Sequence, residues 1–256
     1  MNFPMTVAAI ALAALMSPAD AAALKESGDP LASARWGDMH QTVLAGAPVL
    51  FDPRVKVVAP SIAESPMQVP VTIDASELSG VREVVVFADF NPIVEVLRFF
   101  PEAAPATLGF RIKLQQSSPV RAAVRTADGI WHVGGSWVNT TGGGCTAPAA
   151  GKAAPDWERT LNTVSGRQWN EGPNKGRLRL RILHPMDTGL VAGTPAFHLE
   201  EIRFTDSDGK VLMRVQTYEP VAENPVFTLN RGEGSAPVEV SGRDNNGNTF
   251  HSRITP

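Results

Sequence analysis

Apolar and polar residues alternate with a period of two in short runs along most of the chain. In the run 108–114, every second side chain from Leu108 to Leu114 is apolar. Arg111 and Lys113 fall between them, on the opposite face of a strand. Such alternation predicts strands of antiparallel sheets that are buried on one face only.

The same period marks strands in two blocks of the chain. The first block contains the runs 67–73, 81–88, 94–100, 108–114 and 130–138, and the second contains 178–183, 198–204, 211–217, 225–229, 238–240 and 249–254. Turn signals such as Asp208-Gly209 and Asn246-Gly247 separate the runs, because both need the positive φ that Gly and Asn accept. We therefore predict an all-β protein with two β-sandwich domains.

One segment has helical rather than strand spacing. Between Asp29 and Leu44, the apolar residues Leu31, Trp36 and Met39 are spaced for one side of a helix. This predicts a short N-terminal helix, which we include in a first domain of residues 24–141.

Residues 142–174 are rich in Gly and Pro and contain few apolar side chains. This composition is typical of a linker. We expect it to join the first domain, 24–141, to a second sandwich of residues 175–256.

Residues 1–21 have the features of a secretory signal peptide. A ten-residue apolar run from Val7 to Met16 precedes Ser17-Pro18 and a small-residue cleavage pattern that ends at Ala21. The run is too short to cross a bilayer, and no cysteine follows it to accept a lipid. We expect an exported protein with no membrane anchor.

The net charge of the chain is −3. This small negative value indicates neither a nucleic-acid partner nor binding to an anionic membrane surface. Electrostatics alone therefore identify no partner.

Cys145 is the only cysteine, and it follows Gly142, Gly143 and Gly144. A single thiol cannot form an internal disulfide, so in an exported protein it is a free nucleophile or half of an intermolecular bond. Glycines restrict the backbone little, which favours an exposed thiol on a mobile arm that enters a partner's active centre. The alternative is a flexible linker that contains a cysteine by chance.

A catalytic role for Cys145 within its own chain is less well supported. No histidine, His132 included, is placed beside the arm by sequence. An ordinary thiol with a pKa near 8.5 is mostly protonated at neutral pH, so a partner would have to activate it. We predict a protein that is not an enzyme and needs no cofactor.

Four basic residues alternate along one predicted strand: Lys175, Arg177, Arg179 and Arg181. Their spacing places four positive charges on one face. This face could bind an anionic adduct or an acidic partner surface. The alternative, which is the commoner arrangement, is a solvated strand face or a protected sheet edge.

His184 and Met186 offer ligand types that copper accepts, and His198 and Met213 lie in the same block. No second cluster of ligands fixes a geometry. We favour a turn after a strand, with Met186 in the core, and predict no metal site.

The chain resembles two families of bacterial sulfur oxidation. Residues 71–145 resemble the SoxY subunit of the sulfur carrier, on the motifs Val84-Val85-Val86-Phe87, Asn91-Pro92, Arg111-Ile112-Lys113-Leu114, Asp128-Gly129 and the glycine-cysteine arm. Residues 179–254 resemble its SoxZ partner, on the motifs His184-Pro185-Met186-Asp187-Thr188-Gly189, Asn224-Pro225 and Asp244-Asn245-Asn246-Gly247. The fused order resembles the quinoprotein dehydrogenase-associated SoxYZ-like carrier proteins.

The resemblance implies two immunoglobulin-like sandwiches and a periplasmic carrier that binds a sulfur or other thiol-reactive intermediate covalently at Cys145. It also implies periplasmic redox enzymes as partners, with a quinoprotein dehydrogenase system among them. In the family the cysteine lies near a free chain end, whereas here Thr146-Ala147-Pro148 continue into a second domain. Such tethering restricts the arm. The alternative function is an accessory or docking module of the dehydrogenase system, with the cysteine incidental.

Overall fold

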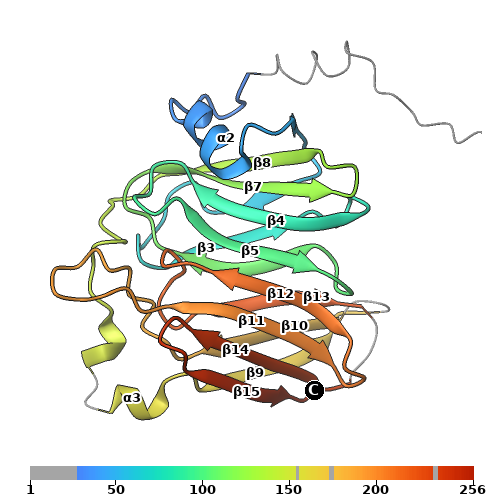
Figure 1. The fold of residues 1–256 in the computed structure, drawn as a ribbon, viewed down its shortest axis with the longest axis vertical. Coiled ribbons are helices and arrows are strands. Elements are labelled where there is room, and N and C mark those ends of the chain that lie inside the picture. Colours follow the sequence, from blue (N-terminus) through green and yellow to red (C-terminus); the bar gives the residue numbers. More distant parts are fainter. Residues whose placement is uncertain (1–27, 154–155, 173–175, 233–235) are drawn as a thin grey trace, which may run out of the picture.

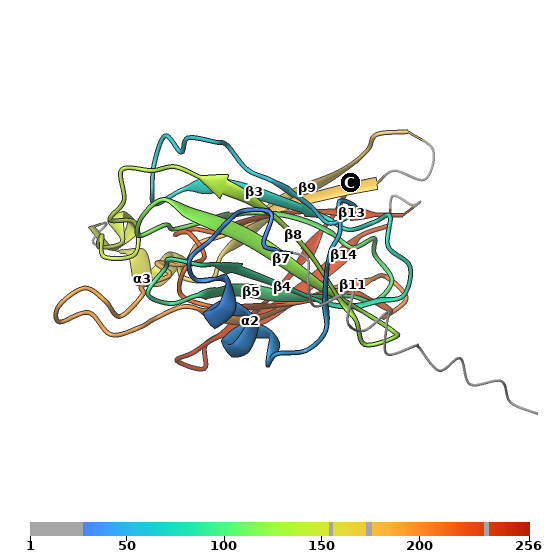
Figure 2. The same cartoon turned by 90° about the horizontal axis from the view of Figure 1, so that it is seen from above.

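The computed structural model describes residues 28–153, 156–172, 176–232 and 236–256. They form two stacked β-sheets with a few short helices (Figures 1 and 2). The predicted all-β sandwich fold is confirmed. The predicted signal peptide, 1–21, lies outside the described residues. Within the described ranges, no helix is long and apolar enough to cross a membrane.

The larger sheet has nine strands drawn from both halves of the chain. Its spatial order is β1 (Val49–Phe51), β8 (Trp131–Val138), β7 (Ser118–Thr126), β4 (Val81–Ala88), β5 (Glu95–Pro101), β12 (Val211–Thr217), β11 (Leu199–Asp206), β14 (Val238–Asp244) and β15 (Thr249–Ile254). Neighbouring strands are antiparallel except for the parallel pair of β1 and β8.

The smaller sheet has six strands and forms the second layer (Figure 2). Its order is β2 (Lys56–Val58), β3 (Val69–Asp74), β6 (Thr107–Ile112), β13 (Val226–Arg231), β10 (Gly176–Ile182) and β9 (Val164–Asn170). The predicted alternation holds in β10, where Leu178 and Leu180 are buried while Arg179 is exposed. This sheet therefore turns one face to the core and the other to solvent.

The two halves of the chain join edge to edge in both layers. In the larger sheet, residues 97–101 of β5 pair with residues 213–217 of β12. In the smaller sheet, Leu108 and Gly109 of β6 pair with Leu229 and Thr228 of β13. One buried apolar core runs through both halves. The two predicted sandwiches therefore share continuous sheets (Figure 1).

The N-terminal helix α2 (Trp36–Leu44) is shorter than the predicted segment 29–44. Asp29 explains the later start, because its carboxylate accepts the backbone N–H groups of Leu31 at 3.1 Å and Ser33 at 2.8 Å. These bonds form a local turn that competes with a helix. Met39 of α2 packs with Phe87 and Trp131 on the outer face of the larger sheet.

Two full-length strands were not predicted. β7 is buried on nearly every residue, so it lacks the alternation that marks a half-exposed strand. β9 lies in the segment predicted as linker, which also contains the one-turn helices η1 (Ala150–Ala153) and α3 (Trp157–Thr160). Its exposed arginine and glycine residues gave it a polar, loop-like composition.

Candidate functional site

The glycines before Cys145 pack against a neighbouring segment and do not form an open arm. The N–H of Gly143 donates to the carbonyl oxygen of Gln115 at 2.9 Å, and that of Gly144 donates to Leu114 at 3.0 Å. A Cβ atom at Gly144 would lie 2.1 Å from the carbonyl oxygen of Pro66. Glycine at this position therefore permits a close backbone approach.

Cys145 is fully buried, so the prediction of an exposed thiol is wrong for this conformation. Its Sγ lies 3.9 Å from the carbonyl oxygen of Lys113, and its N–H donates to Oε1 of Gln115 at 3.3 Å. Its carbonyl oxygen accepts a hydrogen bond of 2.6 Å from Oγ1 of Thr188. Because Thr188 belongs to the second half of the chain, domain pairing holds the cysteine in place.

Lys113 is the side chain whose charge acts on the Cys145 thiol, and it is also buried. Its Nζ donates to the carbonyl oxygens of Met186 and, at 3.3 Å, of Glu219. The alternation correctly placed Lys113 opposite Leu114, but the second half of the chain covers the face on which Lys113 lies. Lys113 and Thr188 therefore both connect the cysteine segment to the second half.

Burial sets the protonation of both groups. It raises the pKa of the Cys145 thiol to about 11, and the nearby charge of Lys113 only partly opposes this. Burial also lowers the pKa of Lys113 to about 8, although Cys145 and Asp187 favour its charged form. At pH 7, on the order of one thiol in ten thousand is ionised, so the Cys145 thiol of the closed site is a very weak nucleophile.

The chain is also anchored after Cys145. The carboxylate of Glu223 accepts the backbone N–H groups of Ala150 at 2.8 Å and Gly151 at 2.6 Å. Lys152 forms an ion pair with Asp187 and lies over the ring of Trp157 at 5.2 Å. The cysteine segment is thus held on both sides, and the predicted mobile arm is not observed.

A small pocket lies next to this anchor. Its volume is about 140 Å³, and its lining includes Lys152, Trp157, His184 and Glu223. It is formed between the segment that follows Cys145 and the turn after β10.

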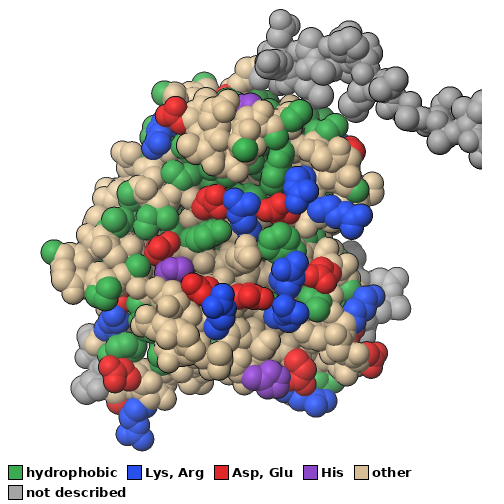
Figure 3. Space-filling view, in the orientation of Figure 1, with side chains coloured by type: hydrophobic (Ala, Val, Ile, Leu, Met, Phe, Trp, Pro, Cys, Tyr) green, Lys and Arg blue, Asp and Glu red, His purple; other side chains and the backbone are tan. Residues whose placement is uncertain are grey.

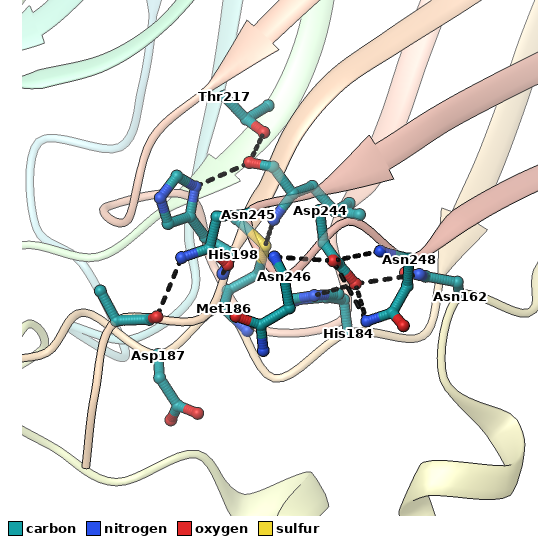
Figure 4. A network of polar contacts seen from close by, with 12 residues as sticks. Asn162, His184, Met186, Asp187, His198, Thr217, Asp244, Asn245, Asn246 and Asn248 are labelled. Atoms are coloured by element: carbon teal, nitrogen blue, oxygen red, sulfur yellow. Dashed lines mark hydrogen bonds and ion pairs between the residues drawn. The ribbon is translucent and has the colours of Figure 1, made fainter.

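The turn after β10 places Met186 in the interior, as predicted, and His184 is buried as well (Figure 4). Nδ1 of His184 accepts the N–H of Met186 at 3.1 Å, and Sδ of Met186 accepts the N–H of Leu199 at 3.4 Å. Both candidate copper ligands are therefore used within the fold. No group of three or more His, Cys, Asp or Glu among the described residues is arranged to hold a metal ion.

Asp244 organises the polar network around this turn (Figure 4). Its buried carboxylate accepts hydrogen bonds from the side chains of Asn162 at 3.2 Å and Asn248 at 2.9 Å. Nε2 of His184 lies 3.7 Å from the same carboxylate. Burial nevertheless lowers the pKa of His184 to about 4, so the ring is neutral at pH 7. In the sequence Asp244 stands out only as the first residue of the turn motif 244–247, which does not indicate this role.

The basic residues of β10 lie on one face, as predicted, and the hydrogen bonds of Cys145 go to other residues. Arg179 and Arg181 are exposed on the outer face of the smaller sheet, and Arg177 is half-buried and paired with Glu171 at 2.8 Å. Lys175 lies outside the described residues.

Two family models match the chain in succession. The model of the sulfur oxidation protein SoxY matches residues 40–145, and that of the sulphur oxidation protein SoxZ matches residues 171–255. The first match ends at Cys145. No curated protein matches the sequence significantly.

Two solved structures are similar to parts of the chain. The sulfur carrier protein SoxY from Chlorobium limicola f thiosulfatophilum aligns at 20% identity with a TM-score of 0.36, covering 41% of this chain and 90% of that chain. The BSP domain of a biofilm associated protein aligns at 14% identity with a TM-score of 0.27, and the alignment covers 85% of this chain and 31% of that chain. Scores of this size carry no functional argument.

Proposed function

We propose that this chain, in which a SoxY domain is fused to a SoxZ domain, carries a sulfur intermediate on Cys145 and presents it to partner enzymes. The two domains indicate the family of sulfur-oxidation carrier proteins, whose members are not catalysts. The observation that carries the proposal is the position of Cys145, the only thiol of the chain, at the end of the matched SoxY domain.

Loading requires the closed site to open, because a buried and protonated thiol is not a nucleophile. Opening breaks the hydrogen bond from Thr188 to Cys145 and those from Gly143 and Gly144 to the segment 114–115. In water the thiol returns toward its ordinary pKa and ionises more readily.

The chemistry after opening needs no oxidant. The thiolate of Cys145 attacks the sulfur of an electrophilic donor R–S–X and forms a new S–S bond. The S–X bond breaks, X leaves with the bonding pair, and the thiol proton goes to solvent. In transfer, a partner's thiolate attacks the outer sulfur and forms a new S–S bond, the bond to Cys145 breaks, and Cys145 leaves as its thiolate.

The attachment site is tested by intact-mass analysis of the protein purified from its native host, with and without reductant. We expect an added mass on the wild-type chain that reductant removes and that the Cys145→Ser variant lacks. The proposal would be contradicted if cells that grow on reduced sulfur compounds yielded nothing but unmodified protein.

Opening is tested with a matched pair of glycine variants. Gly144→Ala places Cβ against Pro66, whereas a Cβ at Gly143 meets nothing within 4 Å. We expect Gly144→Ala to raise the iodoacetamide alkylation rate of Cys145 about tenfold or more, since it displaces the segment. Gly143→Ala is the matched control, because it adds the backbone strain of a φ of +85°, about 1 kcal/mol, but no clash with a neighbour. Wild-type alkylation no faster than global unfolding would contradict opening.

One observation favours a second function. Cys145 is buried, which fits an accessory or docking module in which the thiol only packs. Such a module keeps its activity in cells when Cys145 is replaced by Ser, whereas a carrier loses it. Growth of a Cys145→Ser strain on reduced sulfur compounds, or on alcohols if a quinoprotein dehydrogenase system is the partner, distinguishes the two.

We also propose a periplasmic location, which rests on the signal-peptide pattern of residues 1–21. Fractionation of cells with N-terminal mass analysis tests it. We expect the mature chain in the periplasmic fraction, beginning after about Ala21.

A further inference from the structure

The outer face of the smaller sheet carries guanidinium groups that the fold does not neutralise. Arg111 of β6, Arg167 of β9, and Arg179 and Arg181 of β10 lie on this face. None of the described carboxylates forms an ion pair with any of these four groups. This cationic face contrasts with the net negative charge of the chain.

Two of the arginines face each other across neighbouring strands. Arg179 of β10 is directly in register with Arg167 of β9. Like charges at opposed positions repel, which weakens the pairing of the two strands. An anion bound between Arg167 and Arg179 removes this repulsion. Binding an anion there would therefore also stabilise the pairing of β9 and β10.

Two hollows on this face contain the arginines. One hollow has a volume of about 300 Å³, with Gly109 in its lining and Arg111, Arg177 and Arg179 around it. Gly109 has no side chain, so backbone forms part of the floor of this hollow where β6 and β13 pair. Three threonines and an asparagine of the same lining add hydrogen-bonding groups: Thr72, Thr107, Thr228 and Asn230.

The second hollow continues the first toward the sheet edge. It has a volume of about 320 Å³, and its lining includes Arg167, Arg179 and Arg181. Arg179 and Val226 line both hollows. Together they extend over β3, β6, β13, β10 and β9, about 19 Å across at the usual strand spacing.

The opposite face of the molecule shows that arginines alone do not define this surface. On the larger sheet, acidic and basic side chains lie side by side (Figure 3). Arg98 pairs with Glu83 at 2.8 Å, and Arg214 pairs with Glu102 at 2.7 Å. Arg98 and Arg214 are thus paired within the fold on the larger sheet. On the smaller sheet Arg177 pairs with Glu171, but the four arginines named above have no carboxylate partner among the described residues.

We propose that the outer face of the smaller sheet binds an acidic segment of a partner protein, whose carboxylates pair with Arg111, Arg167, Arg179 and Arg181. The hollows extend over five strands, which suits a polypeptide better than a single inorganic anion. Carboxylate recognition by guanidinium groups is geometrically specific, since each group can form two parallel hydrogen bonds. Cys145 is not part of the lining of either hollow.

The test measures binding of the full chain to poly-L-glutamate by isothermal titration calorimetry at low and high salt. We expect binding at low salt that weakens strongly as salt screens the charges. The double variant Arg111→Ala/Arg179→Ala should bind at least about tenfold more weakly. The matched control, Arg203→Ala/Arg243→Ala on the opposite face, should stay within about twofold of wild type.

Three results would overturn the proposal. They are no binding of poly-L-glutamate, an equal loss in the control variant, or tight binding of inorganic sulfate that excludes the polymer. A fourth result, equal or tighter binding of a polyuridylate probe, would assign the face to nucleic acid instead.

Discussion

Arg121 and Lys113 are both basic side chains buried in the first half of the chain, but their charges are balanced in opposite ways. Arg121 lies between two carboxylates, with hydrogen bonds to Asp29 at 2.6 Å and Asp89 at 3.0 Å. Among the described residues, Lys113 has only the carbonyl oxygens of Met186 and Glu219 as hydrogen-bond acceptors.

The pKa values record this difference. Burial lowers the pKa of Arg121, but its hydrogen bonds to Asp29 and Asp89 more than offset burial and hold it above its ordinary value. Burial lowers the pKa of Lys113 to about 8, and its weaker neighbours do not restore it. Paired carboxylates keep the Arg121 cation charged, whereas the poorly paired Lys113 loses its proton at a lower pH in the closed site than it would in water.

The largest expected effect is that of Arg121→Met on stability. The substitution leaves Asp29 and Asp89 buried without a counter-charge, which costs about 3–5 kcal/mol. Arg125→Met on the same strand is the control, because its half-exposed pair with Glu83 contributes about 1 kcal/mol or less. Urea unfolding measures both, and equal losses would contradict the structural role of Arg121.

The second prediction concerns stability at alkaline pH. The folded state releases the Lys113 proton near pH 8, whereas the unfolded chain keeps it to about 10.5, so this group makes stability rise between those values. Cys145 acts oppositely from pH 9 to 11, since its thiol stays protonated only in the folded state. Each contribution is at most about 3 kcal/mol.

Urea unfolding at pH 7 to 10 checks both signs. We expect Lys113→Met to remove the rise above pH 8 and Cys145→Ser to remove the opposing fall above pH 9. Identical profiles for wild type and Lys113→Met would show that Lys113 is not buried as a cation.

The third prediction concerns the contact between the halves at the thiol. Thr188→Val removes the hydrogen bond to the Cys145 carbonyl oxygen and costs about 1–2 kcal/mol. Because this bond is lost on opening, alkylation of Cys145 should accelerate several-fold. The exposed Thr249→Val is the control. An unchanged rate in Thr188→Val would mean that opening does not separate these groups.

The smallest expected effect is that of Lys113 on thiol acidity. Its positive charge favours the thiolate, so Lys113→Met should shift the pH midpoint of Cys145 alkylation upward by a fraction of a unit. Lys210→Met, at an exposed turn, should leave the midpoint unchanged. A downward shift would exclude Lys113 as a group that favours ionisation.

The sequence predicted local structure well where one face of a strand is exposed. The runs 211–217 and 249–254 match β12 and β15 at both ends. The run 81–88 matches β4, which is covered on both faces but has an uninterrupted apolar stretch from Val84 to Ala88. β7 is also covered on both faces, by the core and in part by α2, but Arg121 and Arg125 interrupt its apolar residues, and it escaped prediction.

The candidate site was predictable in identity but not in environment. Cys145 was recognisable as a lone thiol after glycines, but its burial depends on Thr188 and on a segment near Lys113, both remote in sequence. A glycine run permits a mobile arm and a tight backbone contact equally well, and only the neighbours of Gly144 decide between them. The assignment of Cys145 as the attachment site stays a prediction.

The strand pairs β5–β12 and β6–β13 have a consequence for assembly. In a complex of two separate subunits, such a junction would depend on protein concentration and could exchange members. Within one polypeptide, covalent linkage fixes a one-to-one ratio and supplies the second half at a high effective concentration. Within the intact chain each half has two free strand edges, one in each sheet. Expressed alone, either half would expose two more, at the strands that form the junction, and we expect it to self-associate.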